Sequence, residues 1–178
     1  MLEDVADLGL PPADRARALR LASSVLRMLE PVDKVLDRQL RKSPPLAVRN
    51  VLRLAVIERA LGSPAHGVVN AAVEIVRGAK RTAHLAGLVN AVLRALPEAD
   101  VLAGLPAQKL PRWLRQPLVH GWGREVVTAI EGVQAGEPPL DLTLRAGFPA
   151  PEGELLPTGS LRLRGAGQVS TLPGYAEG

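Results

Sequence analysis

The sequence predicts a mainly α protein, in which a helical bundle is followed by a linker and a partial α/β subdomain. Hydrophobic residues make up 47% of the 178 residues, but aromatic residues only 2%. The core therefore has to consist mainly of Ala, Leu and Val, which suits close helix–helix packing and argues against a large β-sandwich. Proline and glycine divide the first half of the chain into segments with helical spacing of apolar residues. Beyond residue 137 the spacing changes to the alternation typical of strands.

Five helical segments are expected in residues 10–97, the predicted bundle domain. The first places Leu19, Val25 and Leu29 on one face, and Pro31 is expected to open the turn after it. The third is apolar on most of its surface, which predicts that it is the buried central helix. The short connections between segments predict a compact bundle. The expected helices are 14–30, 32–42, 46–61, 64–77 and 82–96.

The second half is expected to contain a linker, residues 98–110, and an incomplete subdomain, residues 111–178. Two helices and two strands are expected in this subdomain. Such a set does not easily bury a core of its own, so this part has the character of the beginning of a larger domain. The expected elements are helices at 111–121 and 124–135 and strands at 140–145 and 161–164.

Several function classes are disfavoured by the composition. The chain has no cysteine, which excludes disulfides, thiolate catalysis and cysteine-based zinc sites within it. It has no apolar run long enough to cross a membrane, and its first ten residues lack the basic start of a secretory signal. We therefore expect a cytoplasmic location. No catalytic residue and no metal site are expected, because no nucleophile or acid–base set is evident and the histidines lack ligand spacing: His66, His84 and His120.

The positive charge is concentrated in the first half of the chain. Residues 12–97 contain 15 Lys and Arg against 6 Asp and Glu, whereas residues 98–178 contain 7 against 9. A helical domain with such a surplus is expected to attract a polyanion, with an affinity that falls as the salt concentration rises. The alternative is a well-solvated basic surface without a specific partner.

Basic residues recur at helical spacing and are the candidate RNA contacts. The expected helices place them in small groups on common faces, with Lys80 and Arg81 beside Arg77 if helix 64–77 extends that far, and each group could bind two or three phosphates. No Phe, Tyr or Trp precedes Trp113, so base stacking is not expected, and contact through charge and shape is favoured. The candidate RNA-binding residues are Arg38, Arg41 and Lys42, then Arg49 and Arg53, then Arg77, Lys80 and Arg81, and Arg94.

Two short segments nearly repeat each other. Residues 67–73 and 87–93 share the pattern Gly, aliphatic, Val, Asn, Ala, aliphatic, aliphatic. Asparagine is a mediocre helix former, so its presence in both segments suggests a structural task such as fixing the packing of neighbouring helices. Asn70 and Asn90 each lie four residues before a charged side chain, on the same helical face. A direct role in RNA contact is the alternative.

Taken in order, these segments resemble the NusB-type RNA-binding domain. The resemblance is carried by residues 45–55, 65–74 and 87–94. More narrowly, the chain resembles the front of the RsmB/Sun family, bacterial methyltransferases that make 5-methylcytosine in small-subunit ribosomal RNA. This resemblance covers about residues 12 to 178 and implies a NusB-like helical bundle that binds and positions ribosomal RNA. Further stretches in the family's order are 110–114, 122–123, 138–142 and 172–178.

Two departures from the family shape the expected function. In the family, Leu-Pro-Gly-Tyr-Ala-Glu-Gly leads into a domain that binds S-adenosylmethionine and holds two catalytic cysteines, whereas this sequence ends there at Gly178 and has no cysteine. We therefore expect no cofactor in these residues and no methyl transfer by them alone. The family also usually has a further helix before the stretch that matches residues 10–14, where this chain has an acidic leader.

An alternative function is a protein–protein or antitermination module without RNA affinity of its own. Its partner would dock on the helical face that the missing first helix leaves uncovered. No membrane partner is expected for either function.

Overall fold

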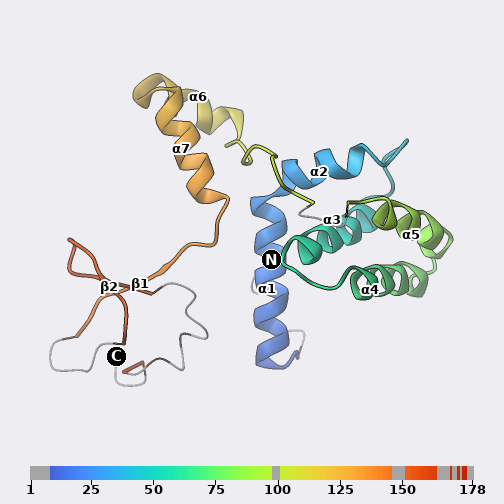
Figure 1. Cartoon of the computed structure of the whole chain (residues 1–178), viewed down its shortest axis with the longest axis horizontal. Coiled ribbons are helices and arrows are strands. Elements are labelled where there is room, and N and C mark those ends of the chain that lie inside the picture. The colour runs from blue at the N-terminus through green and yellow to red at the C-terminus, as the bar shows by residue number, and fades with distance from the viewer. Residues whose placement is uncertain are drawn as a thin grey trace. The chain divides into compact units, whose positions relative to one another are not determined.

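The computed structural model describes residues 9–97, 101–145 and 151–163, together with Val169, Leu172, Gly174 and Tyr175 (Figure 1). Within these residues it contains seven α-helices, a short 3-10 helix and a three-stranded sheet, which confirms the mainly α fold class. The chain divides into two compact units, residues 1–136 and 137–178, each of which is described by itself. The domain limits proposed from the sequence, at residues 97 and 111, stay a prediction.

Five helices form the bundle, and α3 lies at its centre (Figure 1). Helix α3 contacts each of the other four, and its Val48, Leu52 and Val56 have no exposed surface. The prediction of a buried central third helix is confirmed. The helices are α1 (Pro12–Arg27), α2 (Leu29–Asp37), α3 (Leu46–Ala60), α4 (Ala65–Gly78) and α5 (Ala86–Arg94), with the 3-10 helix η2 (Ala83–Leu85) before α5.

The boundary between the first two helices differs from the predicted one. Helix α1 ends at Arg27 and α2 begins at Leu29, so Met28 alone separates them. Pro31 lies in the first turn of α2, where its missing N–H costs no hydrogen bond because the first N–H groups of a helix have no partner within it. The prediction that Pro31 opens the turn is therefore wrong.

The core of the bundle consists of aliphatic side chains, as the composition predicts. Its buried members are Ala, Val, Leu and Ile from all five helices, with Val101 from the segment that follows. Leu36, Leu52 and Leu93, on α2, α3 and α5, are among the largest side chains that are completely buried. Short aliphatic side chains let helix axes approach closely, so this core accounts for the compact bundle.

Helices α6 (Arg112–Trp122) and α7 (Arg124–Gln134) form a hairpin, and their bounds are close to those predicted from the sequence. Gly123, with φ of 81°, makes the tight turn between them, a conformation that glycine adopts without strain. Glu131 is 4% exposed and accepts hydrogen bonds from Arg115 Nε and the backbone N–H of Leu110, both at 2.8 Å. The Arg115 hydrogen bond lowers the pKa of Glu131 although burial opposes the shift.

The second unit contains a small antiparallel sheet in the order β1-β3-β2. Its strands are β1 (Leu140–Leu142), β2 (Glu154–Leu155) and β3 (Leu161–Leu163), with Asp141 opposite Arg162. Strands near 140 and 161 were predicted, although β1 is shorter than expected and Arg164 lies outside the described residues. Strand β2 was not predicted, because two residues carry no detectable alternation.

Candidate nucleic-acid interface

Few of the basic side chains on the bundle are neutralised. Within residues 12–97, all of which are described, Arg17 pairs with Glu58, Arg77 with Glu74, and Arg49 and Arg53 with carboxylates of α2. The remaining basic side chains have no carboxylate partner in the described parts of the chain, so the charge surplus is presented to solvent. They are Arg15, Arg20, Arg27, Lys34, Arg38, Arg41, Lys42, Arg59, Lys80, Arg81 and Arg94.

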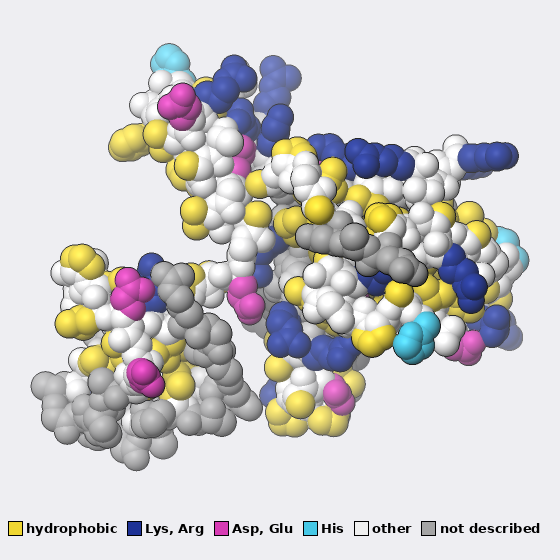
Figure 2. All heavy atoms as spheres, in the orientation of Figure 1, with side chains coloured by type: hydrophobic (Ala, Val, Ile, Leu, Met, Phe, Trp, Pro, Cys, Tyr) yellow, Lys and Arg dark blue, Asp and Glu magenta, His cyan; other side chains and the backbone are white. Residues whose placement is uncertain are grey.

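One concentration of positive charge follows α2. Figure 2 shows Lys and Arg side chains gathered along α2 and the loop after it. Arg38, Arg41 and Lys42 are exposed there, but α2 ends at Asp37. The prediction that these three residues share a helical face is therefore wrong, because the chain leaves the helix ahead of Pro44 and Pro45. They lie together on a loop instead.

Arg49 and Arg53 do share a face of α3, as the sequence predicts, but they are largely buried against α2. Arg53 donates to both carboxylate oxygens of Asp33 at 2.8 and 2.7 Å. Arg49 donates to Asp33 at 3.1 Å and to Asp37 at 2.7 Å. These guanidinium groups therefore join α2 to α3, and their role in RNA contact stays a prediction.

The two carboxylates of this ion-pair network were missed in the sequence. Burial raises the pKa of Asp33, but hydrogen bonds and charge from Arg53 and Arg49 outweigh it and hold the pKa below its ordinary value. Asp33 and Asp37 lie four residues apart, as do Arg49 and Arg53. Such matching spacings of opposite charge on successive helices could have indicated the ion-pair network from the sequence.

The predicted group of Arg77, Lys80 and Arg81 does not form one helical face, because α4 does not extend that far. Helix α4 ends at Gly78, so Lys80 and Arg81 lie in the following turn and do not extend the face of Arg77. Arg77 donates to Glu74 at 2.7 Å. Thr82 Oγ1 donates to the carbonyl of Val76 at 2.9 Å and closes the end of the helix. Lys80 and Arg81 remain exposed and available.

The near-repeated segments lie on α4 and α5, and their residues divide between the core and the surface. The buried positions are aliphatic, such as Val69 and Val89, whereas Gly67, Gly87 and Asn70 are exposed. Asn90 is partly exposed and accepts a hydrogen bond from Arg94 Nε at 3.1 Å. The structural task proposed for the asparagines stays a prediction.

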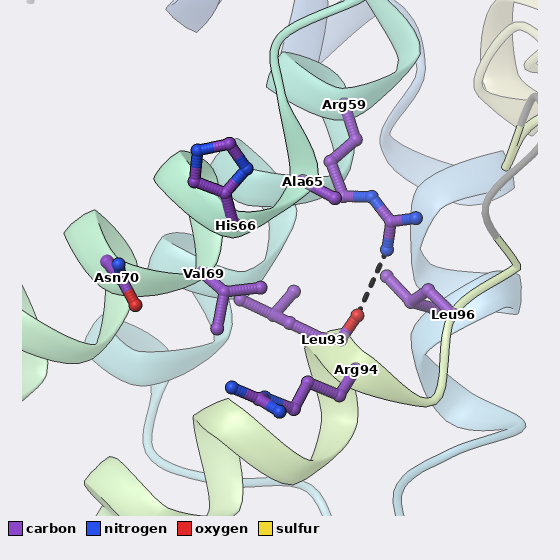
Figure 3. Close-up of a pocket in the computed structure, with 8 residues that line it drawn as sticks. All are labelled: Arg59, Ala65, His66, Val69, Asn70, Leu93, Arg94 and Leu96. Carbon is purple, nitrogen blue, oxygen red and sulfur yellow. Dashed lines mark hydrogen bonds between the residues drawn. The ribbon is translucent and has the colours of Figure 1, made fainter.

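A hollow of about 340 Å³ opens between the start of α4 and the end of α5 (Figure 3). Val69, Leu93 and Leu96 supply apolar lining, and His66, Asn70, Arg59 and Arg94 supply polar lining. Figure 3 shows Val69 and Leu93 between the His66 ring and the Arg94 guanidinium. Arg59 donates to the carbonyls of Leu93 at 3.0 Å and Pro97 at 2.6 Å, which satisfies acceptors at the end of α5.

Among the described residues, no three His, Asp or Glu side chains are grouped so as to hold a metal ion. Of the histidines, His66 lines the hollow, His84 lies in η2 and His120 in α6. Across the described stretches, no helix combines the length and apolar character that crossing a bilayer requires.

Comparison with known proteins gives one family match and two relatives. The model of the NusB family matches residues 1–98. Ribosomal RNA small subunit methyltransferase B of Thermus thermophilus is 41% identical over 108 residues, which is 58% of this chain and 26% of that protein. The protein of the same name from Xanthomonas campestris pv. campestris is 30% identical over 187 residues, 94% of this chain and 42% of that protein.

The chain thus spans less than half the length of these relatives, and the matches cover their N-terminal part. No solved structure matches it.

Proposed function

The chain belongs to the NusB family, and from this premise we propose that its helical bundle binds ribosomal RNA and positions it for a cytosine-C5 methyltransferase. The names of the two relatives and the order of the shared motifs support the methyltransferase context. In such a protein S-adenosylmethionine would bind a catalytic domain outside these residues. A cytoplasmic location is part of the same proposal.

The observation that carries the proposal is the unneutralised charge of the bundle. Four arginines are paired with carboxylates, while the basic side chains after α2 and after α4 are exposed and unpaired within the described chain. Each Lys or Arg that neutralises a phosphate releases a counterion, so such a surface favours a polyanion strongly at low salt.

The composition of the bundle favours contact with the RNA backbone over contact with bases. Residues 12–97 contain no Phe, Tyr or Trp, so no aromatic platform for stacking exists there. Arginine guanidinium groups bind phosphates with two parallel hydrogen bonds, which fixes register as well as charge. We therefore expect recognition of a folded RNA by charge and shape.

The test is a binding titration of the protein with a structured small-subunit rRNA fragment at several salt concentrations. We expect the logarithm of the association constant to fall linearly with the logarithm of salt, by about 0.7–0.9 per phosphate contacted. The triple variant Arg38→Ser, Arg41→Ser, Lys42→Ser should flatten this slope by about two contacts. Low-salt affinity no better than that of a neutral helical protein would refute the proposal.

A second function, that of a protein–protein module, is supported by exposed apolar side chains on α7. Val126, Ile130 and Val133 follow helical spacing and are 45%, 37% and 81% exposed. A stripe of this kind is common where a partner docks. Oligomers in size-exclusion chromatography, combined with no shift of the rRNA fragment, would favour this function over RNA binding.

A further inference from the structure

The glycines of the two near-repeats are not needed for packing. A Cβ added at Gly67 or Gly87 would meet no atom within 4 Å, so neither glycine is required for close contact between helices. Glycine inside a helix is unfavourable relative to alanine, and asparagine is a weak helix former. The chain therefore carries poorly helix-forming residues at matching positions of two helices, and for the glycines close packing does not explain them.

Three of these four residues, Asn70, Gly87 and Asn90, line hollows between α4 and α5. The start of α4, with His66, lies beside the end of α5, with Arg94, around the hollow of about 340 Å³. A second hollow of about 360 Å³ lies where the end of α4 runs beside the start of α5 and Gly87. Asn70 lines both hollows, which lie along the same antiparallel helix pair and are together called the α4–α5 groove. Asn90 lines the second.

The polar groups in this groove suit an anion. Arg94 is oriented through its Nε by Asn90 and, in the described chain, its two terminal nitrogens have no partner. Within the same residues the Asn70 amide also forms no hydrogen bond, so its N–H groups can donate. Glu74, the acidic side chain in the lining, is paired with Arg77, which lines the groove beside it. The remaining charge, from Arg59 and Arg94, is positive.

We propose that the α4–α5 groove binds the phosphodiester backbone of the RNA, with Arg94 and Asn70 donating to phosphate oxygens. The bare helix surface at Gly87 lets the strand approach closely, and Asn90 acts as a positioning residue for Arg94. This inference rests on the proposed RNA-binding function and assigns a specific site to it.

The experiment measures rRNA-fragment affinity and its salt slope for the full chain and for single variants. Arg94→Gln should weaken binding about 5- to 10-fold and reduce the slope by about one contact. Asn70→Leu should weaken it several-fold with little change in slope, because no charge is lost. Gly87→Ala should weaken binding while the melting temperature stays equal or rises, since alanine favours the helix.

Matched controls separate the groove from general effects of charge and helix content. Gly132→Ala on α7 replaces a helical glycine whose Cβ would also meet no atom within 4 Å, and it should leave RNA affinity unchanged. Arg112→Gln on α6 removes one exposed positive charge away from the groove and should change affinity less than twofold. Thermal melts of every variant confirm that the binding data refer to folded protein.

The outcomes distinguish this inference from the function on which it rests. If the wild-type chain binds RNA with a steep salt slope but the Arg94, Asn70 and Gly87 variants all bind equally well, the groove is overturned and the RNA-binding function stands. If the wild-type chain shows no salt-dependent binding, the proposed function itself fails. Self-association of the wild type that Gly87→Ala abolishes, with normal RNA affinity, would assign the groove to a protein partner and overturn the inference.

Discussion

The helical bundle and the three-stranded sheet bury apolar side chains to very different extents. In the bundle, all five helices contribute to one continuous aliphatic core, and α3 contacts every other helix. In the sheet, Leu161 and Leu163 on β3 are the buried strand residues among those described. Strands of two or three residues offer little area for burial, and a small sheet without further cover is marginal. The bundle therefore has the means to fold by itself, whereas the sheet depends on a few contacts.

The ion pairs of the two regions also differ in how far they are buried. In the bundle, Asp33 is partly buried and binds two arginines from another helix. In the sheet, Asp141 and Arg162 face each other across β1 and β3, with two hydrogen bonds of 2.7 Å, but both are well exposed. The hydrogen bond from Arg162 lowers the pKa of Asp141. Exposed pairs contribute little to stability because water and salt screen them, and a pair with two hydrogen bonds such as this one lies at the upper end of that small range.

The largest effect that would test this comparison is expected from Leu52→Ala at the centre of the bundle. Leu52 has no exposed surface, so the substitution removes buried area and leaves a cavity. We expect a loss of about 2–5 kcal/mol in the free energy of unfolding, measured by urea denaturation followed by circular dichroism at the helical signal. Leu163→Ala should leave that helical transition in place. Equal effects of the two substitutions would show that the bundle and sheet unfold together.

Next in size is Gly153→Ala at the sheet. A Cβ there would lie 2.7 Å from Leu163 Cδ2 and 2.8 Å from the carbonyl oxygen of Arg162, so the strand has to move. Overpacking of this kind costs about 1–3 kcal/mol. We expect loss of protected amide protons in β1 and β3, measured by hydrogen exchange, while exchange in α3 stays as in the wild type. Unchanged protection in β3 would contradict the close approach. Gly159→Ala would not serve as a control, because Gly159 has φ of 82° and alanine is strained in that conformation.

The smallest effect is expected from Asp33→Asn in the ion-pair network. Arg49 retains Asp37, and Asp33 is a quarter exposed, so we expect a loss of only about 1 kcal/mol at neutral pH. Because the folded-state pKa of Asp33 lies below its ordinary value of 3.8, its stabilising contribution is present above that value. The contribution is lost as pH falls through the lowered pKa.

Denaturation of wild type and Asp33→Asn between about pH 7 and pH 3 tests this sign. The difference in unfolding free energy should shrink as the pH falls below about 4. Asp141→Asn, which breaks an exposed pair of similar geometry, serves as the matched control and should cost less at every pH. A difference that grows toward low pH would contradict the assignment of the Asp33 shift.

The candidate nucleic-acid interface shows which features helical spacing can predict and which it cannot. Helical spacing correctly placed Arg49 and Arg53 on one face of a helix. It did not show that Asp33 and Asp37 occupy the space opposite, because periodicity fixes a residue's direction only within its own helix. It also placed Arg38, Arg41 and Lys42 on a helix that in fact ends earlier, at Asp37. Helix ends depend on local turns and tertiary contacts and are the least certain part of a periodic pattern.

By itself, the sequence determined the mainly α class, the number and approximate extent of the helices, the aliphatic core and the family. These properties follow from composition and from apolar periodicity, which act along a single helix. Only the tertiary structure decided which basic side chains remain unpaired and that Asn70, Gly87 and Asn90 line hollows between the same two helices. Both depend on how helices distant in sequence pack side by side, and the spacing of residues along one chain does not contain that information.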